Sequence, residues 1–319
     1  MKKKIISVVI PTYNEELNID NAYFKVKEVF QKLPGYDYEI VFADNCSTDS
    51  SQKLIRKITK KDKKVTAVFL SRNFGGEYSS LAGMKVATGN ATTVLDCDLQ
   101  DPPELIIDFI KQWEKGNEVV IGYRRHIEEK LLIKPLRIIF YKLFKLISNI
   151  DIPLNAGTFS LVDRRVMEII NNLPERNRFF RGLRAWAGFK VAKVEYVRRK
   201  RKYGQSQNTI IDYIRDAERG FFGFSFVPLE IVTYIGFVLV IVSFIFIIGY
   251  ILLFFLLSNP VPGFMTIISL ITFLGGIQIL AISIIGKYVQ IIFEETKSRP
   301  PFIIREIIND HRSQKSKSF

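Results

Sequence analysis

The sequence predicts an α/β domain with a mainly parallel sheet, followed by a hairpin of two transmembrane helices. Between residues 5 and 122, short apolar runs alternate five times with helical segments, a pattern typical of parallel strands joined by right-handed crossovers. Residues 231–286 contain no charged side chain. A break at 258–263 leaves two apolar stretches, each long enough to cross a hydrocarbon core, which needs about 20 residues.

Each of the five expected strands ends in a polar loop, and a helix follows each of the first four. The strands are expected at residues 5–10, 38–43, 65–70, 91–95 and 118–122. The helices are expected at about 17–32, from the loop at 44–49 to 60, from the turn at 71–76 to 87, and at 102–115. Asn14 is a candidate N-cap for the first helix, and Pro102 fits a first helical turn. A helix over 163–172 and a short strand at 195–202 are expected further along.

The most informative stretch is the end of the fourth strand, where Asp96, Asp98 and Gln100 alternate along the chain. Side chains at i and i+2 share one face of an extended strand, so these three oxygen donors are expected to point the same way. Hard oxygen ligands suit Mg²⁺ or Mn²⁺ bound together with a phosphorylated substrate. Two solvated aspartates in a turn are the plainer alternative for an Asp-x-Asp pair taken alone.

Three of the expected strand ends carry acidic residues, namely Glu15, Asp44 and the Asp96/Asp98 pair. Ligands of open α/β sheets bind outside the carboxyl ends of the strands, so a nucleotide could lie across this edge. The sequence has neither a Gly-x-Gly-x-x-Gly nor a Walker motif. The common dinucleotide and P-loop sites are therefore not supported.

The chain is strongly basic, with 46 Lys and Arg against 32 Asp and Glu and a formal net charge of +14. This balance favours an anionic partner, either a phosphorylated substrate or an anionic membrane surface. Nucleic acid is disfavoured because basic residues flank the apolar segments and no nucleic-acid-binding motif is present. The two cysteines, Cys46 and Cys97, make no disulfide framework and indicate a reducing compartment.

Three basic stretches, at residues 130–150, 176–184 and 195–202, mix Lys and Arg with apolar residues. Each is either a surface for phosphates and lipid headgroups or an ordinary solvated face. Basic residues also flank the apolar pair, so the positive-inside rule places both chain ends in the cytoplasm. The expected layout is a cytoplasmic catalytic domain over 1–228, a membrane hairpin over 229–293 with helices at 231–257 and 264–286, and a basic cytoplasmic tail over 294–319 that is frayed from Arg305.

Four motifs carry a family resemblance: VVIPTYNEE at 8–16, DNCSTD at 44–49, SRNFG at 71–75 and DCDLQDPPE at 96–104. Together they resemble the inverting family 2 glycosyltransferases. The similarity is greatest to the polyprenyl-phosphate branch, which holds the dolichol-phosphate mannose synthases and the bacterial undecaprenyl-phosphate glycosyltransferases of the GtrB type. Residues 178–183 and the closing helix pair are similar to the bacterial form, so the resemblance covers essentially the whole chain.

This resemblance implies a GT-A fold and a hexosyltransferase that uses a nucleotide sugar, with a UDP-sugar favoured. It implies polyprenyl (undecaprenyl) phosphate as the acceptor, Mg²⁺ or Mn²⁺ as the cofactor, and inversion at the anomeric carbon. The product would be a lipid-linked sugar for cell-envelope glycosylation, made by a multi-pass protein of the cell membrane. Relatives also suggest a homo-oligomer.

By the same resemblance, roles attach to single positions of this chain. The positions that match the base and ribose site are Pro11, Tyr13, Glu15 and Asp44. Those that match the metal and diphosphate site are Asp96, Asp98 and Gln100. A phosphate-facing set is matched by Arg124, Arg201, Gly204 and Ser206. Asp98, Arg124 and Arg201 are the expected catalytic residues, and Arg124, Arg201 and Ser206 are the candidates for the acceptor phosphate.

The acceptor chemistry fits a site without a general base. A phosphate monoester has a second pKa of about 6, so it is already a nucleophile at neutral pH, whereas a sugar hydroxyl would need a base. Two positions depart from the family pattern. Thr158 stands where many bacterial relatives have Asp, and Gln207 stands where relatives usually have Lys, which affects the expected sugar and activity more than the fold.

Two other functions remain open. A processive polysaccharide synthase would extend a sugar hydroxyl and would carry a Gln-x-x-Arg-Trp motif and more membrane spans; residues 184–186 (Arg-Ala-Trp) resemble that motif only weakly. A catalytically inactive membrane scaffold is compatible with Thr158 and Gln207. Intact Asp44, Asp96 and Asp98 argue against it.

Overall fold

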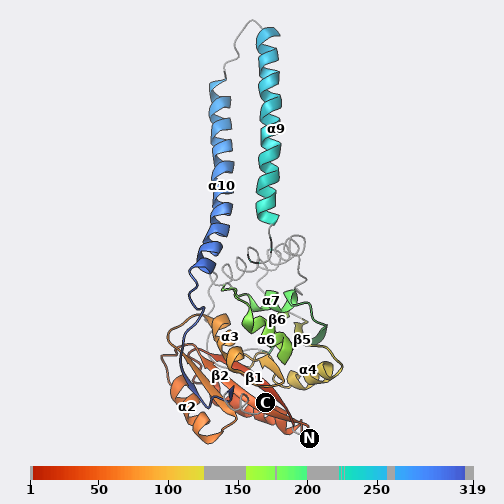
Figure 1. Ribbon diagram of the computed structural model, residues 1–319, viewed down its shortest axis with the longest axis vertical. Coiled ribbons are helices and arrows are strands. Elements are labelled where there is room, and N and C mark those ends of the chain that lie inside the picture. Colours follow the sequence, from red (N-terminus) through yellow and green to blue (C-terminus); the bar gives the residue numbers. More distant parts are fainter. Residues whose placement is uncertain are drawn as a thin grey trace.

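A twisted sheet flanked by helices forms the base of the molecule, and two long helices extend away from it (Figure 1). The computed structural model describes residues 3–125, 156–176, 178–199, 223, 225, 227–256 and 263–312. The predicted basic stretch at 130–150 lies outside the described residues, as do Arg201, Gly204, Ser206 and Gln207.

The sheet has eight strands in the order β7-β5-β6-β4-β1-β2-β3-β8. Their bounds are β1 Lys4–Thr12, β2 Tyr36–Asp44, β3 Val65–Leu70, β4 Ala91–Val94, β5 Val119–Arg124, β6 Ala156–Asp163, β7 Val191–Tyr196 and β8 Ile304–Ile308. Strand β1 pairs in parallel with both β2 and β4, and the β2–β3 and β5–β7 pairs are also parallel. The pairs that include β6 or β8 are antiparallel. The mainly parallel sheet is therefore confirmed.

One part of the expected topology differs from the structure. The fifth strand, β5, runs in the same direction as β4, as the regular alternation predicted, but β6 lies between the two and runs antiparallel to both. Local apolar patterns define where strands form, whereas the neighbours of a strand depend on pairing over long sequence separations. The strand expected at 195–202 is also displaced, since β7 ends at Tyr196.

Helices cover both faces of the sheet because successive strand residues point to opposite sides. Their bounds are α1 Ile19–Gln31, α2 Ser51–Lys61, α3 Gly76–Val86, α4 Leu105–Glu114, α6 Arg164–Asn172 and α7 Phe180–Trp186. One core cluster joins α1, α2 and α4 to residues such as Val8 and Ile10, and the other joins α3, α6 and α7 to residues such as Val9. This three-layer arrangement leaves the loops at the strand ends free to carry a site.

Asn14 is not the N-cap of α1, because Asn18 occupies that position and makes no side-chain capping bond. Asn14 instead has a left-handed backbone (φ 52°), which asparagine tolerates better than most residues. Its side-chain oxygen accepts a hydrogen bond from the Thr48 amide at 2.8 Å. Asn14 therefore ties the loop after β1 to the loop after β2.

The sequence predicted a frayed tail from Arg305 onward, but part of this segment is an ordered strand. Residues Ile304–Ile308 form β8 and pair antiparallel with β3. Phe302 is buried in one core cluster, where Ile304 and Ile307 pack against it. Basic neighbours made this segment read as a solvated tail, but its apolar residues complete the edge of the sheet.

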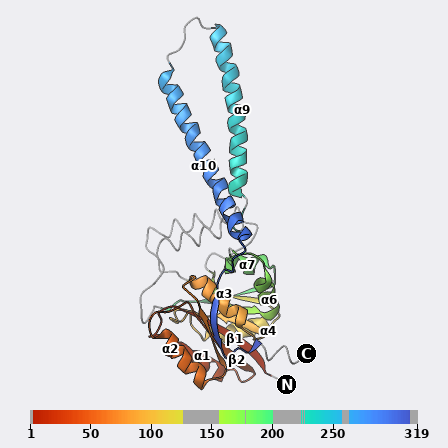
Figure 2. The same cartoon turned by 60° about the vertical axis from the view of Figure 1, so that its left-hand side comes forward.

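Helices α9 (Val227–Leu256) and α10 (Phe264–Thr296) lie next to each other and extend away from the sheet in both views (Figures 1 and 2). Many of their apolar side chains are exposed, including Phe237 and Ile279. Within the described residues, Phe273–Thr296 is long and apolar enough to cross a membrane, and Val227–Leu239 is a shorter apolar stretch. The predicted pair of helices is present, but its crossing of a membrane twice stays a prediction.

Candidate active site

The loops that follow β1, β2 and β4 meet at one edge of the sheet. The register places Thr12 opposite Asp44, and it places Val9 opposite Val94 on the other side of β1. The Asn45 amide donates to the Thr12 carbonyl at 2.8 Å, which continues the pairing beyond β2. The acidic residues at the ends of three strands therefore share one edge, as expected.

Asp44 is fully buried at this edge, and within the described residues only one of its two carboxylate oxygens is paired. Oδ2 accepts hydrogen bonds from the Gln52 side chain at 2.8 Å and from the Ser47 amide at 3.2 Å. Oδ1 is buried and has no hydrogen-bond partner in the part of the chain that the structure describes. Burial raises the pKa of Asp44, and its hydrogen bonds oppose that rise. A buried acceptor without a donor is costly, so Oδ1 is suited to an N–H or O–H group of a ligand.

The loops around Asp44 are connected by hydrogen bonds between polar side chains and backbone amides. The Asn14 amide donates to Ser47 Oγ and the Glu15 amide donates to Ser51 Oγ, both at 3.0 Å. Asn73 accepts from the Asn45 side chain at 2.8 Å. Pro11 and Tyr13 lie half-buried at the end of β1. The predicted base and ribose residues therefore belong to one ordered set of loops.

The acidic stretch after β4 is a turn and not an extended strand. The Leu99 amide donates to the Asp96 carbonyl at 3.1 Å, and Leu99 itself has a positive φ of 53°. Asp98 Oδ1 accepts from the Gln100 amide at 3.2 Å. The expectation that Asp96, Asp98 and Gln100 share one face of a strand is wrong, because β4 ends at Val94.

Asp96 nevertheless lies among other carboxylates, so the turn can receive a cation. Burial, and then the charges of Asp101 and Asp98, raise the pKa of Asp96 above its usual value. The described residues contain no group of three or more Asp, Glu, His or Cys that could hold a metal alone. Mg²⁺ commonly binds through one or two carboxylates together with waters and substrate phosphates. Asp96 and Asp98 fit that mode of binding.

Asp101 connects this turn to the rest of the sheet. Its side chain is 1% exposed and lies 3.2 Å from Arg124 Nη2 and 3.4 Å from Arg198 Nε. The Tyr196 hydroxyl donates to Asp101 at 2.6 Å and accepts from Arg124 Nε at 3.0 Å. The Asp101 charge, with help from Tyr196, raises the pKa of Arg124 against the effect of burial. Arg124 is therefore held as a cation beside the acidic turn.

The sequence predicted no individual role for Asp101, Tyr196 or Arg198. A partial signal was present, because Asp101 lies within the acidic motif and Arg198 belongs to a basic run. Their association depends on the parallel pairing of β5 with β7, which brings Arg124 opposite Tyr196. That pairing cannot be read from the local pattern.

A second arginine, Arg184, lies on α7 near the same region. It is 2% exposed, and its Nη2 donates to the Gly157 carbonyl at 3.3 Å. Its Nη1 is buried and finds no hydrogen-bond partner among the residues that the structure describes. Burial, and then the charge of Arg181, lower the pKa of Arg184 to about 9. Gly157 contacts Arg124 on its other side, since a Cβ there would lie 2.9 Å from Arg124 Nη2.

Replacing Arg184 by Met is expected to raise the melting temperature by about 2–4 °C. Met fills a similar volume, and it removes a buried cation that has no carboxylate partner among the described residues. The measurement is thermal unfolding in detergent. The matched control is Arg165→Met, which removes an arginine that is 69% exposed. A melting temperature below that of the control would show that the Arg184 charge is stabilising.

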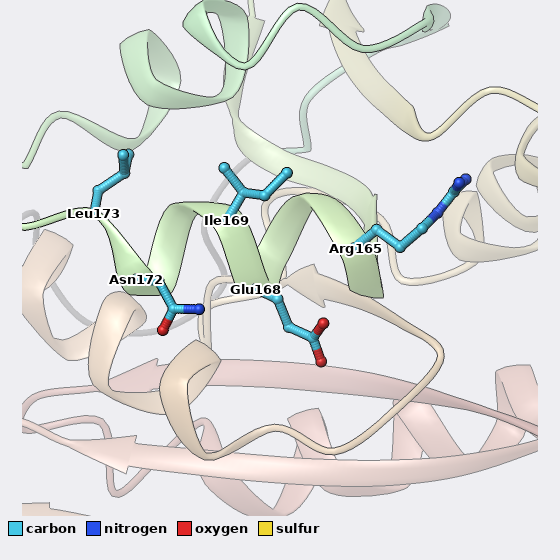
Figure 3. A pocket seen from close by; sticks show the side chains of 5 residues that line it. All are labelled: Arg165, Glu168, Ile169, Asn172 and Leu173. Atoms are coloured by element: carbon cyan, nitrogen blue, oxygen red, sulfur yellow. The ribbon is translucent and has the colours of Figure 1, made fainter.

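A shallow surface depression elsewhere on the domain is not lined by a set of residues suited to catalysis. It is lined by one face of α6 and the residue after it, namely Arg165, Glu168, Ile169, Asn172 and Leu173 (Figure 3). The Arg164 amide at the start of α6 donates to the Asn90 carbonyl, which precedes β4. Helix α6 therefore begins at the opposite edge of the sheet from the acidic turn.

These features define an α/β domain with an acidic site at the ends of its parallel strands, and comparison with known proteins specifies the family. Residues 7–170 match the family described as Glycosyl transferase family 2. The chain belongs to this family and is a glycosyltransferase. The predicted resemblance is thus confirmed.

Relatives match over nearly the whole chain. The prophage bactoprenol glucosyl transferase homolog of Escherichia coli is 39% identical, covering 95% of this chain and 99% of its own. The bactoprenol glucosyl transferase of Shigella phage SfII is 38% identical, covering 94% and 97%. An uncharacterized glycosyltransferase of Bacillus subtilis, YkcC, is 37% identical, covering 94% and 93%.

Proposed function

We propose that this protein transfers a hexose from a nucleotide sugar to a polyprenyl phosphate, with inversion at the anomeric carbon. The observation that carries this proposal is the half-paired buried carboxylate of Asp44, which lies on the same sheet edge as the acidic turn. One group suits a nucleobase and the other suits a metal-bound diphosphate. The names of the bactoprenol relatives support a polyprenyl phosphate acceptor.

The donor would lie across the ends of β1, β2 and β4. Asp44, with Pro11, Tyr13 and Glu15 nearby, would hold the base and ribose, and a UDP-sugar is favoured. Asp96, Asp98 and Gln100 would face the diphosphate with Mg²⁺ or Mn²⁺. The metal would neutralise charge that develops on the leaving nucleoside diphosphate. The protein itself would contribute positioning to this step, because Asp96 and Asp98 would determine where the diphosphate binds.

The acceptor would approach from the side of Arg124. The guanidinium of Arg124 uses Nε and Nη2 for Tyr196 and Asp101, and arginine has five N–H donors in total. Arg124 can therefore keep its partners and still donate to a phosphate. Arg201 and Ser206 complete the proposed acceptor site. Gln207 would leave one phosphate-facing charge missing there, and Thr158 would tune the choice of donor. No general base is required, because the phosphate monoester is already ionised.

The membrane part would hold the lipid acceptor near this site. We propose that α9 and α10 cross the cell membrane as a hairpin, with the catalytic domain and both chain ends in the cytoplasm. The layout then follows the expected bounds of 1–228, 229–293 and 294–319, although β8 joins the third part to the catalytic sheet. A homo-oligomer is part of the same proposal.

The test is transfer of labelled sugar into lipid. Purified protein in liposomes receives undecaprenyl phosphate, Mg²⁺ or Mn²⁺ and a panel of labelled nucleotide sugars, and label is followed into the organic phase. Lipid-linked label from one donor is expected. Label released as free sugar, with none in lipid, would argue for a different acceptor.

Asp44→Asn is expected to weaken binding of UDP by about 10- to 100-fold. Oδ2 of Asp44 accepts two hydrogen bonds within the protein, and Oδ1 would accept a hydrogen bond from the ligand. Asn has one accepting oxygen and one donating nitrogen, so its N–H group would face an N–H donor either of the protein or of the base. Calorimetric titration of UDP measures the change. An unchanged affinity for both UDP and GDP would remove Asp44 from the base site.

A further inference from the structure

The strand that follows the last membrane-type helix reaches back to the proposed nucleotide site. Arg305 of β8 donates from Nη2 to the Gln52 side-chain oxygen at 3.0 Å. The Gln52 side-chain nitrogen then donates to Asp44 Oδ2 at 2.8 Å. The chain of contacts therefore runs from the C-terminal strand through α2 to the buried carboxylate.

A β-bulge explains why Arg305 can take part. Leu70 of β3 pairs with Ile304 and Phe69 pairs with Glu306, so Arg305 is the extra residue. A bulge redirects side chains from the regular alternation. Both Arg305 and Glu306 reach α2 as a result, where Glu306 pairs with Arg56 at 2.7 Å, one helical turn beyond Gln52.

Hydrogen bonds at both ends of its amide fix the orientation of Gln52, the middle residue of this chain of contacts. A glutamine amide has an accepting oxygen and a donating nitrogen, whereas arginine can only donate and a carboxylate can only accept. Arg305 donates to the oxygen of Gln52, and the nitrogen of Gln52 donates to Asp44 and, at 3.2 Å, to the Ser47 carbonyl. Without Arg305, the Gln52 oxygen loses its donor, and only the two acceptors at its nitrogen hold the amide in place.

We propose that Arg305 and Gln52 are positioning residues that hold Asp44 with Oδ1 toward the base of a nucleoside diphosphate. This inference rests on the proposed function, since it assigns Asp44 to the base. It adds that the segment after α10 belongs to the donor site. A base that offers an N–H donor, as uracil and guanine do, is the ligand class that this arrangement accepts.

The same segment is fastened to the end of α10. Residues 297–303 join α10 to β8, and the Glu295 side chain accepts from the Arg176 amide at 2.8 Å. Further bonds hold the strand after its bulge, including the Asn309 side chain to the Thr59 and Val65 carbonyls, both at 2.9 Å. Arg305 is thus presented to Gln52 from a docked strand.

The experiment is titration of the full-length protein in detergent with UDP and with GDP, each with Mg²⁺. Arg305→Met and Gln52→Leu are each expected to raise the dissociation constant about tenfold. The double variant is expected to be no weaker than Gln52→Leu alone, because both residues act on one carboxylate. Arg305→Lys, which keeps a donor, is expected to recover most of the affinity.

The control is Arg312→Met, which removes a tail arginine that pairs with Asp310. It is expected to bind UDP as the unaltered protein does, because exposed surface pairs contribute little. If the unaltered protein binds neither nucleotide, the proposed function fails and the inference with it. If that protein binds but Arg305→Met matches Arg312→Met, or if the two losses add in the double variant, the inference alone is overturned.

Discussion

Asp98→Ala is expected to lower the rate of sugar transfer by about 10²- to 10³-fold. Asp98 lies in the turn that carries the proposed metal and diphosphate site, and its carboxylate adds to the negative charge around Asp96. Removing it takes away one of the two carboxylates that can hold a cation there. Label in the organic phase measures the loss, with undecaprenyl phosphate as the acceptor.

The matched control is Asp108→Ala on α4, where the carboxylate is half-exposed and pairs with Lys111. It removes the same charge from the same region of sequence without touching the turn, so full transfer is expected. Binding of UDP without metal is expected to persist in Asp98→Ala, because Asp44 lies on the other side of β1. Equal transfer rates in the two variants would separate Asp98 from the reaction.

Asp101→Asn is expected to cost about 3 kcal/mol of stability. Asp101 is 1% exposed and compensates two arginines, Arg124 and Arg198. The neutral amide removes the carboxylate that Arg124 contacts directly and leaves only the charge of Asp96 to act on it, and it also places an N–H group against donors. Transfer is expected to fall as well, since the position of Arg124 depends on Asp101 and Tyr196.

Thermal and denaturant unfolding of the detergent-solubilised protein measure this change. Asp310→Asn is the comparison, because its partner Arg312 is exposed and such surface pairs contribute only about 0–1 kcal/mol. Should Asp101→Asn unfold at the same denaturant concentration as Asp310→Asn, the buried ion pair would not be a stabilising element of the fold.

The catalytic sheet was predictable from the sequence to the extent that its pattern is local. Apolar runs at 65–70 and 91–95 correspond closely to β3 and β4, and parallel neighbours place Asp44 and the acidic turn on one edge. Backbone detail within the turn was not predictable. Leu99 adopts a positive φ, which its residue type does not favour, so the extended arrangement of Asp96 and Asp98 was wrong.

Groups that depend on distant pairing were missed for a different reason. Asp101 meets Tyr196 across 95 residues and Arg305 meets Gln52 across 253. Each contact follows from where β7 or β8 joins the sheet. The residues of β8 have the apolar content of a strand, but their basic surroundings resemble a solvated tail. Only the pairing with β3 distinguishes the two.

The position of β8 also has a consequence for the order in which the protein can be made. Strand β3 is synthesised early, yet the strand that covers its edge is reached only after residues 71–303, including both long helices, have been translated. Domains generally begin to fold from the N-terminus during synthesis, so β3 waits with an open edge, a known aggregation hazard. A ribosome that stops before Ile304 would release a chain with its helices complete and its sheet unfinished. The sheet is therefore completed only after α10 has been made, which couples maturation of the enzyme to translation of the segment that carries β8.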